Sequence, residues 1–160
     1  MLQAVGQAIS DWAHVEEGLF AVFYELMASP SKGPPSCTFI TAENLRTKIQ
    51  MVDSMVRNTQ SGRKVLSEWD KLQIRCNKLR IARNDLAHRK VAMFTIGRGK
   101  AQPALTTYSH DIRHHLKEDK FEIPSHIKID RVKELSKLFR RLGGDLSKLA
   151  DNIRRSLAKS

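Results

Sequence analysis

Residues 83–88 read Arg-Asn-Asp-Leu-Ala-His and combine two side chains that could act together on a phosphate group. The planar guanidinium of arginine donates paired hydrogen bonds to phosphate oxygens and keeps its charge at physiological pH. Histidine has the side-chain pKa closest to neutrality, so its imidazole can accept or donate a proton during a reaction. A permanent cation placed shortly before an imidazole therefore suits phosphate recognition combined with proton transfer.

The two side chains do not lie on one face if residues 83–88 are helical. At ~100° per residue, Arg83 and His88 are about 140° apart around the helix axis. Arg83 continues an apolar seam, whereas His88 continues a second line through Ile74 and Ile81, with Asn84 one turn before it. Either the helix loosens at its end, or two helices meet there. We expect a symmetric homodimer in which the ends of two such helices face each other.

Glu16 interrupts the apolar stripe of the first helical segment, four residues after Trp12 and three before Leu19. A buried carboxylate needs a cation or several hydrogen-bond donors. We therefore expect Glu16 to be buried and to contact Arg83 or another residue of the 83–88 segment. A salt bridge that only holds two helices together explains the same pattern, and the two interpretations are compatible.

Four segments with helical periodicity would position these residues. On each of them, apolar residues recur every three or four positions, as on the buried stripe of an amphipathic helix. The expected helices cover residues 2–29, 41–58, 63–88 and 130–158, with Thr41 as the N-cap of the second. The sequence therefore predicts an all-α bundle of four or five helices that forms a single domain over residues 1–160.

Three interruptions break this helical pattern. The prolines and the glycine within residues 29–35 predict a loop. Residues 89–129, between the third and fourth helices, form an irregular insertion in which 91–96 and 104–108 are expected to pair as a small β-hairpin. The glycine pair at 143–144 falls inside the fourth helix and should weaken or kink it.

The chain of 160 residues carries 28 Lys and Arg against 17 Asp and Glu, a formal net charge of +11. Such an excess favours an anionic partner, nucleic acid first and an acidic membrane surface second, although solubility alone explains many basic domains. No apolar stretch is long enough to span a bilayer, and the two cysteines, Cys37 and Cys76, fit a reducing interior, so we expect a cytoplasmic protein. The cations that we expect to contact RNA are Arg89, Lys90, Arg98, Lys100, Arg140 and Arg141.

No metal site is expected. His110, His114 and Glu118 are spaced by four and four, which could approach a metal on a helix. A solvated polar stretch is favoured there, because the segment has little helical apolar patterning. The Gly-Arg-Gly at residues 97–99 fits a hairpin turn better than a phosphate loop. We therefore expect chemistry without a metal or a cofactor.

The Arg-Asn-x3-His pattern at the end of a long helix resembles the signature of the HEPN family. The Trp-x3-Glu spacing of Trp12 and Glu16 is similar to the first helix of small bacterial members. This resemblance implies a four- or five-helix bundle in which two protomers bring their motifs together as one composite, metal-independent RNase site. It also implies RNA as substrate and an antitoxin or regulatory protein as a further partner. Lys90 stands where the toxin branch of that family has a tyrosine.

The leading hypothesis is a metal-independent endoribonuclease that serves as a toxin or a phage-defence effector. His88 would act as general base or acid, and Arg83 would stabilise charge on the phosphoryl oxygens. Asn84 would orient His88 or contact phosphate, with Glu16 and Asp85 as supporting residues. Two alternatives stay open: a module of the same fold that binds nucleic acid or a nucleotide without cleaving it, and an α-helical oligomerisation domain.

Overall fold

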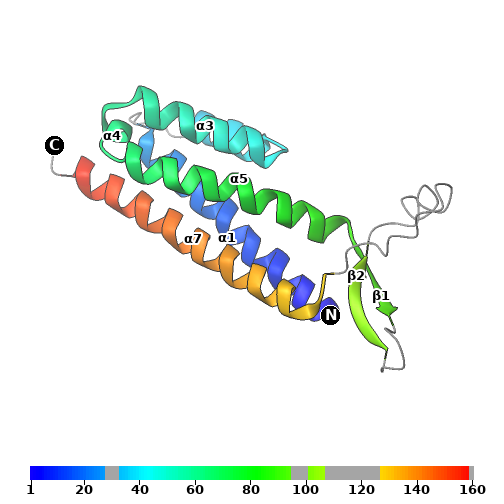
Figure 1. The fold of residues 1–160 in the computed structure, drawn as a ribbon. Coiled ribbons are helices and arrows are strands. Elements are labelled where there is room, and N and C mark those ends of the chain that lie inside the picture. Colours follow the sequence, from blue (N-terminus) through cyan, green and yellow to red (C-terminus); the bar gives the residue numbers. More distant parts are fainter. Residues whose placement is uncertain (28–32, 95–100, 107–126, 159–160) are drawn as a thin grey trace, which may run out of the picture.

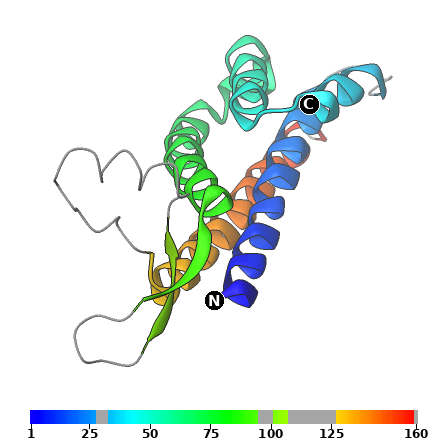
Figure 2. The same ribbon diagram turned by 90° about the vertical axis from the view of Figure 1, so that its right-hand side faces the viewer.

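Two long helices, α1 (Leu2–Leu26) and α7 (Ile129–Leu157), lie side by side, and α5 (Leu66–His88) packs against both of them (Figure 1, Figure 2). Both α1 and α7 start near the hairpin end of the molecule and run towards the opposite end, so they are parallel, whereas α5 runs the other way (Figure 1). The computed structural model describes residues 1–27, 33–94, 101–106 and 127–158.

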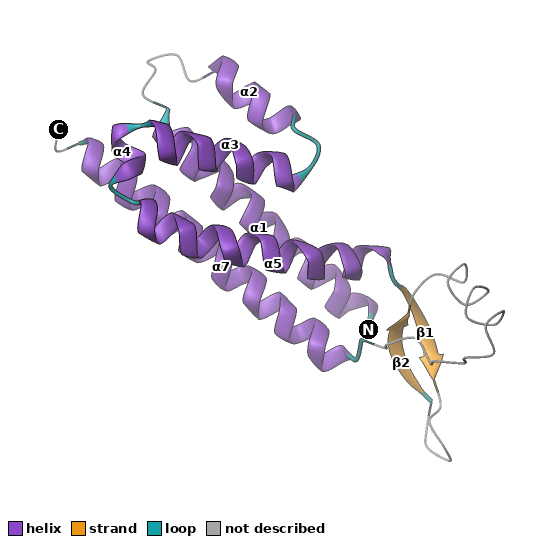
Figure 3. Ribbon diagram, turned by 45° about the horizontal axis from the view of Figure 1, so that its top comes forward, coloured by secondary structure: helices purple, strands orange, loops and turns teal. Residues whose placement is uncertain are grey.

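Three shorter helices and a hairpin complete the described chain. The helices are α2 (Gly33–Thr41), α3 (Leu45–Asn58) and the single turn α4 (Gln60–Arg63). The strands β1 (Lys90–Phe94) and β2 (Gln102–Thr106) form the hairpin at one end of the bundle (Figure 3). The expected helical bundle with a small β-hairpin is therefore confirmed.

Two ion pairs show how α1 and α7 are aligned. Arg140 Nη2 lies 3.1 Å from the Asp11 carboxylate, and Arg154 Nη2 lies 2.9 Å from the Glu25 carboxylate. The two pairs have the same sequence separation of 129 residues, as expected for parallel helices in a constant register. The core between these helices and α5 contains the buried side chains of Trp12, Val15, Leu19, Val22, Trp69, Leu72, Cys76, Phe139, Leu142 and Leu146.

Glycine lets the backbones of α1 and α7 approach each other closely. A Cβ added to Gly143 would lie 2.9 Å from the carbonyl oxygen of His14, and one added to Gly18 would lie 2.7 Å from Leu146 Cβ. Residues 143–144 were expected to weaken or kink the last helix, but α7 is continuous from Ile129 to Leu157. Packing against α1 outweighs the modest helix penalty of glycine.

The helix α2 was not expected, because residues 29–35 were interpreted as a loop. Its first turn contains Pro34 and Pro35, where the missing N–H groups cost no helical hydrogen bond. Phe39 packs on Phe23 with ring centroids 4.8 Å apart. The expected N-cap at Thr41 is also wrong, because Thr41 ends α2.

The cap of α3 is Asn44. Its side-chain oxygen accepts a hydrogen bond from the Thr47 backbone N–H at 2.8 Å, which satisfies one of the free donors in the first turn of the helix. Thr59 plays the same role for α4, since its hydroxyl oxygen accepts from the Gly62 N–H at 3.0 Å. Asparagine is at least as good an N-cap as threonine. Because Thr41 is the last residue of α2, it cannot cap α3, and Asn44 does so instead.

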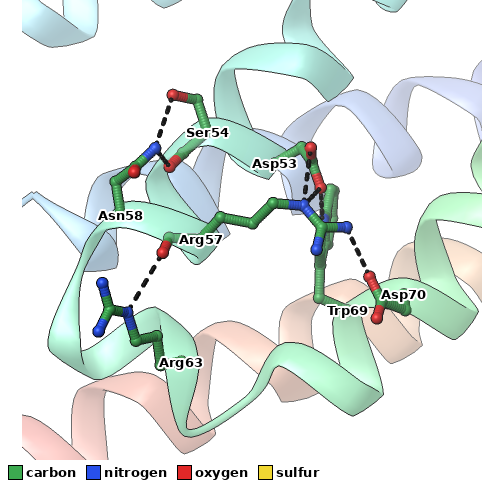
Figure 4. A network of polar contacts seen from close by, with 7 residues as sticks. All are labelled: Asp53, Ser54, Arg57, Asn58, Arg63, Trp69 and Asp70. Carbon is green, nitrogen blue, oxygen red and sulfur yellow. Dashed lines mark hydrogen bonds and ion pairs between the residues drawn. The ribbon is translucent and has the colours of Figure 1, made fainter.

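A polar network attaches α3 to α5 (Figure 4). The Asp53 carboxylate accepts hydrogen bonds from the indole N–H of Trp69 at 2.9 Å and from Arg57 Nε at 3.0 Å. Arg57 also pairs with Asp70 at 2.8 Å. Trp69 is fully buried, so this network satisfies the one polar side-chain atom of a large core residue.

The hairpin is antiparallel, with Lys90 opposite Thr106. It is joined to the start of α7 by two backbone hydrogen bonds between Leu105 and Ile127, of 3.0 and 3.1 Å. Leu105 is buried and belongs to the core cluster, so the hairpin is anchored on the bundle. The expected turn at residues 97–100 lies outside the described residues. None of the described helices is both long and apolar enough to cross a membrane.

The two adjacent glycines of α7 should respond oppositely to alanine. Gly143→Ala places a Cβ against the backbone of His14 and should lower the free energy of unfolding by about 1–3 kcal/mol. Gly144→Ala meets nothing within 4 Å and should raise it by up to about 1 kcal/mol, because alanine favours the helix. Urea unfolding of both variants measures the difference, and equal effects would show that the close approach is absent.

Asp53 should stabilise the fold only while it is ionised. Burial alone would raise the pKa of this carboxyl, but hydrogen bonds from Arg57 and Trp69 outweigh burial and lower the pKa below its ordinary value. Its contribution is therefore complete above the unfolded-state pKa, about 3.9, and is lost as the pH falls through the folded-state pKa. Asp53→Asn should be less stable than the parent by roughly 1–3 kcal/mol at pH 7. Thermal melts at falling pH should show this difference shrinking below about pH 4.

Candidate functional site

The 83–88 segment forms the last turns of α5, which stays helical as far as His88. Arg83 is half-buried, as expected from its place on the seam with the buried Leu72, Cys76 and Leu86. Asn84 and His88 are exposed. The helix therefore does not loosen at its end, and within one chain Arg83 and His88 remain about 140° apart around its axis.

Arg83 and Asn84 open onto a pocket between three helices. The pocket has a volume of about 360 Å³, which is at the small end of the range of ligand sites, roughly 300–1,000 Å³. His88 is not among the residues that line it. The lining residues are Trp12 and Glu16 from α1, Glu43, Asn44, Leu45 and Arg46 from the start of α3, and Arg80, Arg83 and Asn84 from α5.

Two guanidinium groups in this pocket are incompletely bonded. The Nε atoms of Arg80 and Arg83 are buried and have no hydrogen-bond partner among the described residues. Arg83 Nη1 donates one long hydrogen bond, 3.4 Å, to the side-chain oxygen of Asn84. Sequence reasoning missed Arg80, although its position three residues before Arg83 places both on one face of the helix.

Glu16 lines the pocket, but its contacts differ from the expected ones. Its carboxylate accepts a hydrogen bond from the Trp12 indole N–H at 3.2 Å and pairs with Lys48 Nζ at 3.4 Å. The expected contact with Arg83 is not formed, and the Glu16 side chain is 37% exposed rather than buried. Helical spacing identified a carboxylate that needs a cation, but it could not show that α3 supplies this cation.

Asp85 and Arg89 form an ion pair of 2.9 Å at the end of α5. The Arg89 side chain is only 10% exposed, so it is largely covered in this structure, although it was expected to contact RNA. Lys90, the first residue of β1, is exposed. Arg98 and Lys100 lie outside the described residues.

The two cations expected on the fourth helix have different surroundings. Arg140 is exposed but paired with the buried Asp11. Arg141 is exposed and forms no ion pair with the described residues. Other exposed cations accompany it on α7, namely Lys133, Lys137, Lys148 and Arg155.

Asp11 is a buried carboxylate that sequence reasoning did not single out. It accepts hydrogen bonds from the hydroxyl of Ser136, from Gln7 at 3.1 Å and from Arg140. Burial alone would raise its pKa, but these hydrogen bonds outweigh burial and lower the pKa below the ordinary value. Its position three residues after Ala8 and four before Val15, on the buried stripe of α1, was the available signal.

The described residues contain no candidate metal cluster, and the thiol of Cys76 is buried. Among residues 1–27, 33–94, 101–106 and 127–158, no group of three His, Cys, Asp or Glu side chains could hold a metal ion. His110, His114 and Glu118 lie outside these ranges. Burial raises the pKa of the Cys76 thiol to about 12, so it stays protonated and is a poor nucleophile.

In comparisons with known proteins, no protein-family model matches the chain, and neither a curated protein nor a solved structure matches it significantly.

Removing the Glu16 carboxylate should destabilise the junction of α1 and α3. Glu16→Ala leaves the indole N–H of the buried Trp12 and the ammonium of Lys48, 15% exposed, without their partner. The expected loss is about 1–3 kcal/mol in the free energy of unfolding. Glu17→Ala is the matched control, because this side chain is 72% exposed and, among the described residues, forms an ion pair with His14 alone. If urea unfolding shows equal losses for both variants, the Glu16 contacts contribute nothing.

Proposed function

We propose that this chain is a metal-independent endoribonuclease of HEPN type that acts as a homodimer. The observation that carries the proposal is the position of Arg83. This half-buried residue lines a pocket of ligand size, and its Nε has no hydrogen-bond partner among the described residues. A charge at a core-facing position is costly unless it is paired. No carboxylate among the described residues forms an ion pair with Arg83, so a phosphate is a suitable partner.

The reaction would use the RNA's own 2′-hydroxyl as nucleophile. His88 of one copy takes the proton of this hydroxyl, whose oxygen attacks the adjacent phosphorus. The bond from phosphorus to the 5′-oxygen of the next nucleotide breaks, and this oxygen takes a proton from water. Arg83 donates hydrogen bonds to the phosphoryl oxygens, on which negative charge grows. The products are a 2′,3′-cyclic phosphate and a 5′-hydroxyl end, and no step requires a metal.

A second copy would bring the two side chains to one phosphate. Because α5 is regular up to His88, Arg83 of one protomer would act with His88 of the other across a two-fold axis. The surface of α5 supports such a contact, since Ile74 and Ile81 lie on the line of His88 and are each 65% exposed. In the proposed dimer, the second copy would cover these two apolar side chains.

The excess positive charge would hold the RNA backbone. Some exposed cations of α7, among them Lys133, Lys137 and Arg141, form no ion pair with the described residues, unlike Arg131, Arg140 and Arg154. Contacts of this kind neutralise phosphates without reading the sequence, so affinity falls as salt rises. A non-catalytic binding module is the second candidate function, and it is favoured by the absence of His88 from the pocket that contains Arg83.

The enzyme should cut RNA in excess chelator and leave 2′,3′-cyclic phosphate ends. Arg83→Ala should abolish cleavage, and His88→Ala should lower the rate by about 10²–10⁴-fold, the usual contribution of a general acid or base. Lys137→Ala is the control, because loss of one exposed α7 cation should mainly weaken binding and flatten its salt dependence. End-group analysis of cleaved total RNA detects the cyclic phosphate. A substrate with 2′-deoxyribose at the cut position lacks the nucleophile and should stay intact.

Mixing the two inactive variants tests the shared site. If Arg83 and His88 act across the dimer, random exchange of Arg83→Ala and His88→Ala subunits leaves one intact site in half of the dimers, which restores about a quarter of the activity. Cleavage of the 2′-deoxy substrate, an absolute need for a divalent metal, or full activity of His88→Ala would each contradict the mechanism. Binding of RNA without cleavage of any substrate would favour the binding module.

A further inference from the structure

We infer that the pocket between α1, α3 and α5 binds a phosphoryl group within a single chain, and that Arg80 is its second recognition residue beside Arg83. Two sources carry this chemistry, the backbone of an RNA chain and a free nucleotide. The RNA form of the inference rests on the proposed function, whereas the nucleotide form does not require cleavage. Arg80 lies outside the 83–88 segment and has no part in the reaction described above.

The unpartnered donors indicate the ligand's chemistry. Arg80 and Arg83 project from successive turns of α5 onto the same pocket, and each has a buried Nε–H that donates to no described residue. A buried donor without an acceptor costs free energy, so native proteins usually satisfy such groups. The Nε and Nη groups of one guanidinium form a fork that matches two oxygens of a phosphate. A phosphoryl group between the two side chains would satisfy both.

The charges around the pocket also favour an anion. Arg46 adds a third cation from α3, against the carboxylates of Glu16 and Glu43. The Glu16 carboxylate is already paired with Lys48, so it repels an anion less than a free carboxylate would. The first turn of the 14-residue helix α3 also lines the pocket through Leu45 and Arg46 and presents the positive end of its dipole.

The two tryptophans provide a reporter and an internal control. The indole N–H of Trp12 bonds to Glu16 at the pocket wall, so its NMR signal should respond to an anion nearby. The indole N–H of Trp69 bonds to Asp53 between α3 and α5, and Trp69 does not line the pocket. A ligand in the pocket should therefore move the first signal and leave the second in place.

The test is a titration of the ¹⁵N-labelled protein with inorganic phosphate, adenosine 5′-monophosphate and adenosine at constant ionic strength. Both phosphates should shift the Trp12 indole signal saturably, and adenosine should not. Arg80→Ala should weaken phosphate binding by roughly 10–100-fold, the usual loss for a charge-assisted hydrogen bond. Lys71→Ala is the matched control, since it removes one cation of α5 that does not line this pocket.

Two milder variants keep the inference testable if Arg80→Ala does not fold. Arg80→Lys retains the charge without the fork and should bind phosphate more weakly than the parent. Glu16→Gln retains an oxygen for the Trp12 indole while removing a negative charge, and should bind phosphate more tightly. An unmoved Trp12 signal, or equal affinities in the parent and the Arg80 variants, would overturn the inference.

Further comparisons distinguish RNA from a free nucleotide as the ligand, and they test the phosphate pocket separately from the proposed endoribonuclease. A short 2′-O-methyl oligoribonucleotide should bind more tightly than the mononucleotide if RNA is the ligand, and more weakly if a free nucleotide is. His88→Ala should keep phosphate binding, because His88 does not line the pocket. Phosphate binding that depends on Arg80 but without RNA cleavage would reject the proposed function alone. Cleavage without such binding would reject the pocket alone.

Discussion

The close parallel contact of α1 and α7 is the constraint on which the rest of the structure depends. At Gly143 no side chain separates the helix from the backbone of His14, and the pairs Asp11–Arg140 and Glu25–Arg154 hold the same register on either side. Their carboxylates are buried and their guanidinium groups are exposed, so each pair gives a buried charge its required partner. A shift of one residue along α7 would remove every one of these contacts. The register of α1 therefore fixes where Trp12 and Glu16 stand.

Much of the fold could be predicted from the sequence, because apolar spacing is a local property. The third predicted helix, α5, has the expected buried apolar stripe, which contains Trp69, Leu72 and Cys76. The helix α7 differs from its predicted range by one residue at each end. The errors arose where local preference and tertiary context compete. Two prolines indicated a loop, yet they occupy the first turn of α2, where proline is tolerated. The glycine pair of α7 indicated a break, yet one of the glycines is required by its neighbour helix.

The candidate site was predictable only in part, for the same reason. The position of Arg83 on an apolar seam follows from the residue spacing within one helix, and in the structure the Arg83 side chain is half-buried. The partner of Glu16 depends on how three helices meet, and Lys48 on α3 takes the place expected for Arg83. Glu16 pairs with Lys48, and the Nε atoms of Arg80 and Arg83 have no hydrogen-bond partner among the described residues.

The arginine and the histidine of the 83–88 segment lie on different faces of α5. One face brings Arg80 and Arg83 into a three-helix pocket, where donors are desolvated and an anion would be held strongly. The other face places His88 in solvent at the end of the helix, in line with Ile74 and Ile81. A general acid or base must reach the proton that it transfers, so a histidine on this face can serve a phosphate only if another surface brings that phosphate to it. In the proposed mechanism, catalysis by His88 would therefore depend on assembly, whereas the inferred phosphate binding by the pocket would need one chain alone.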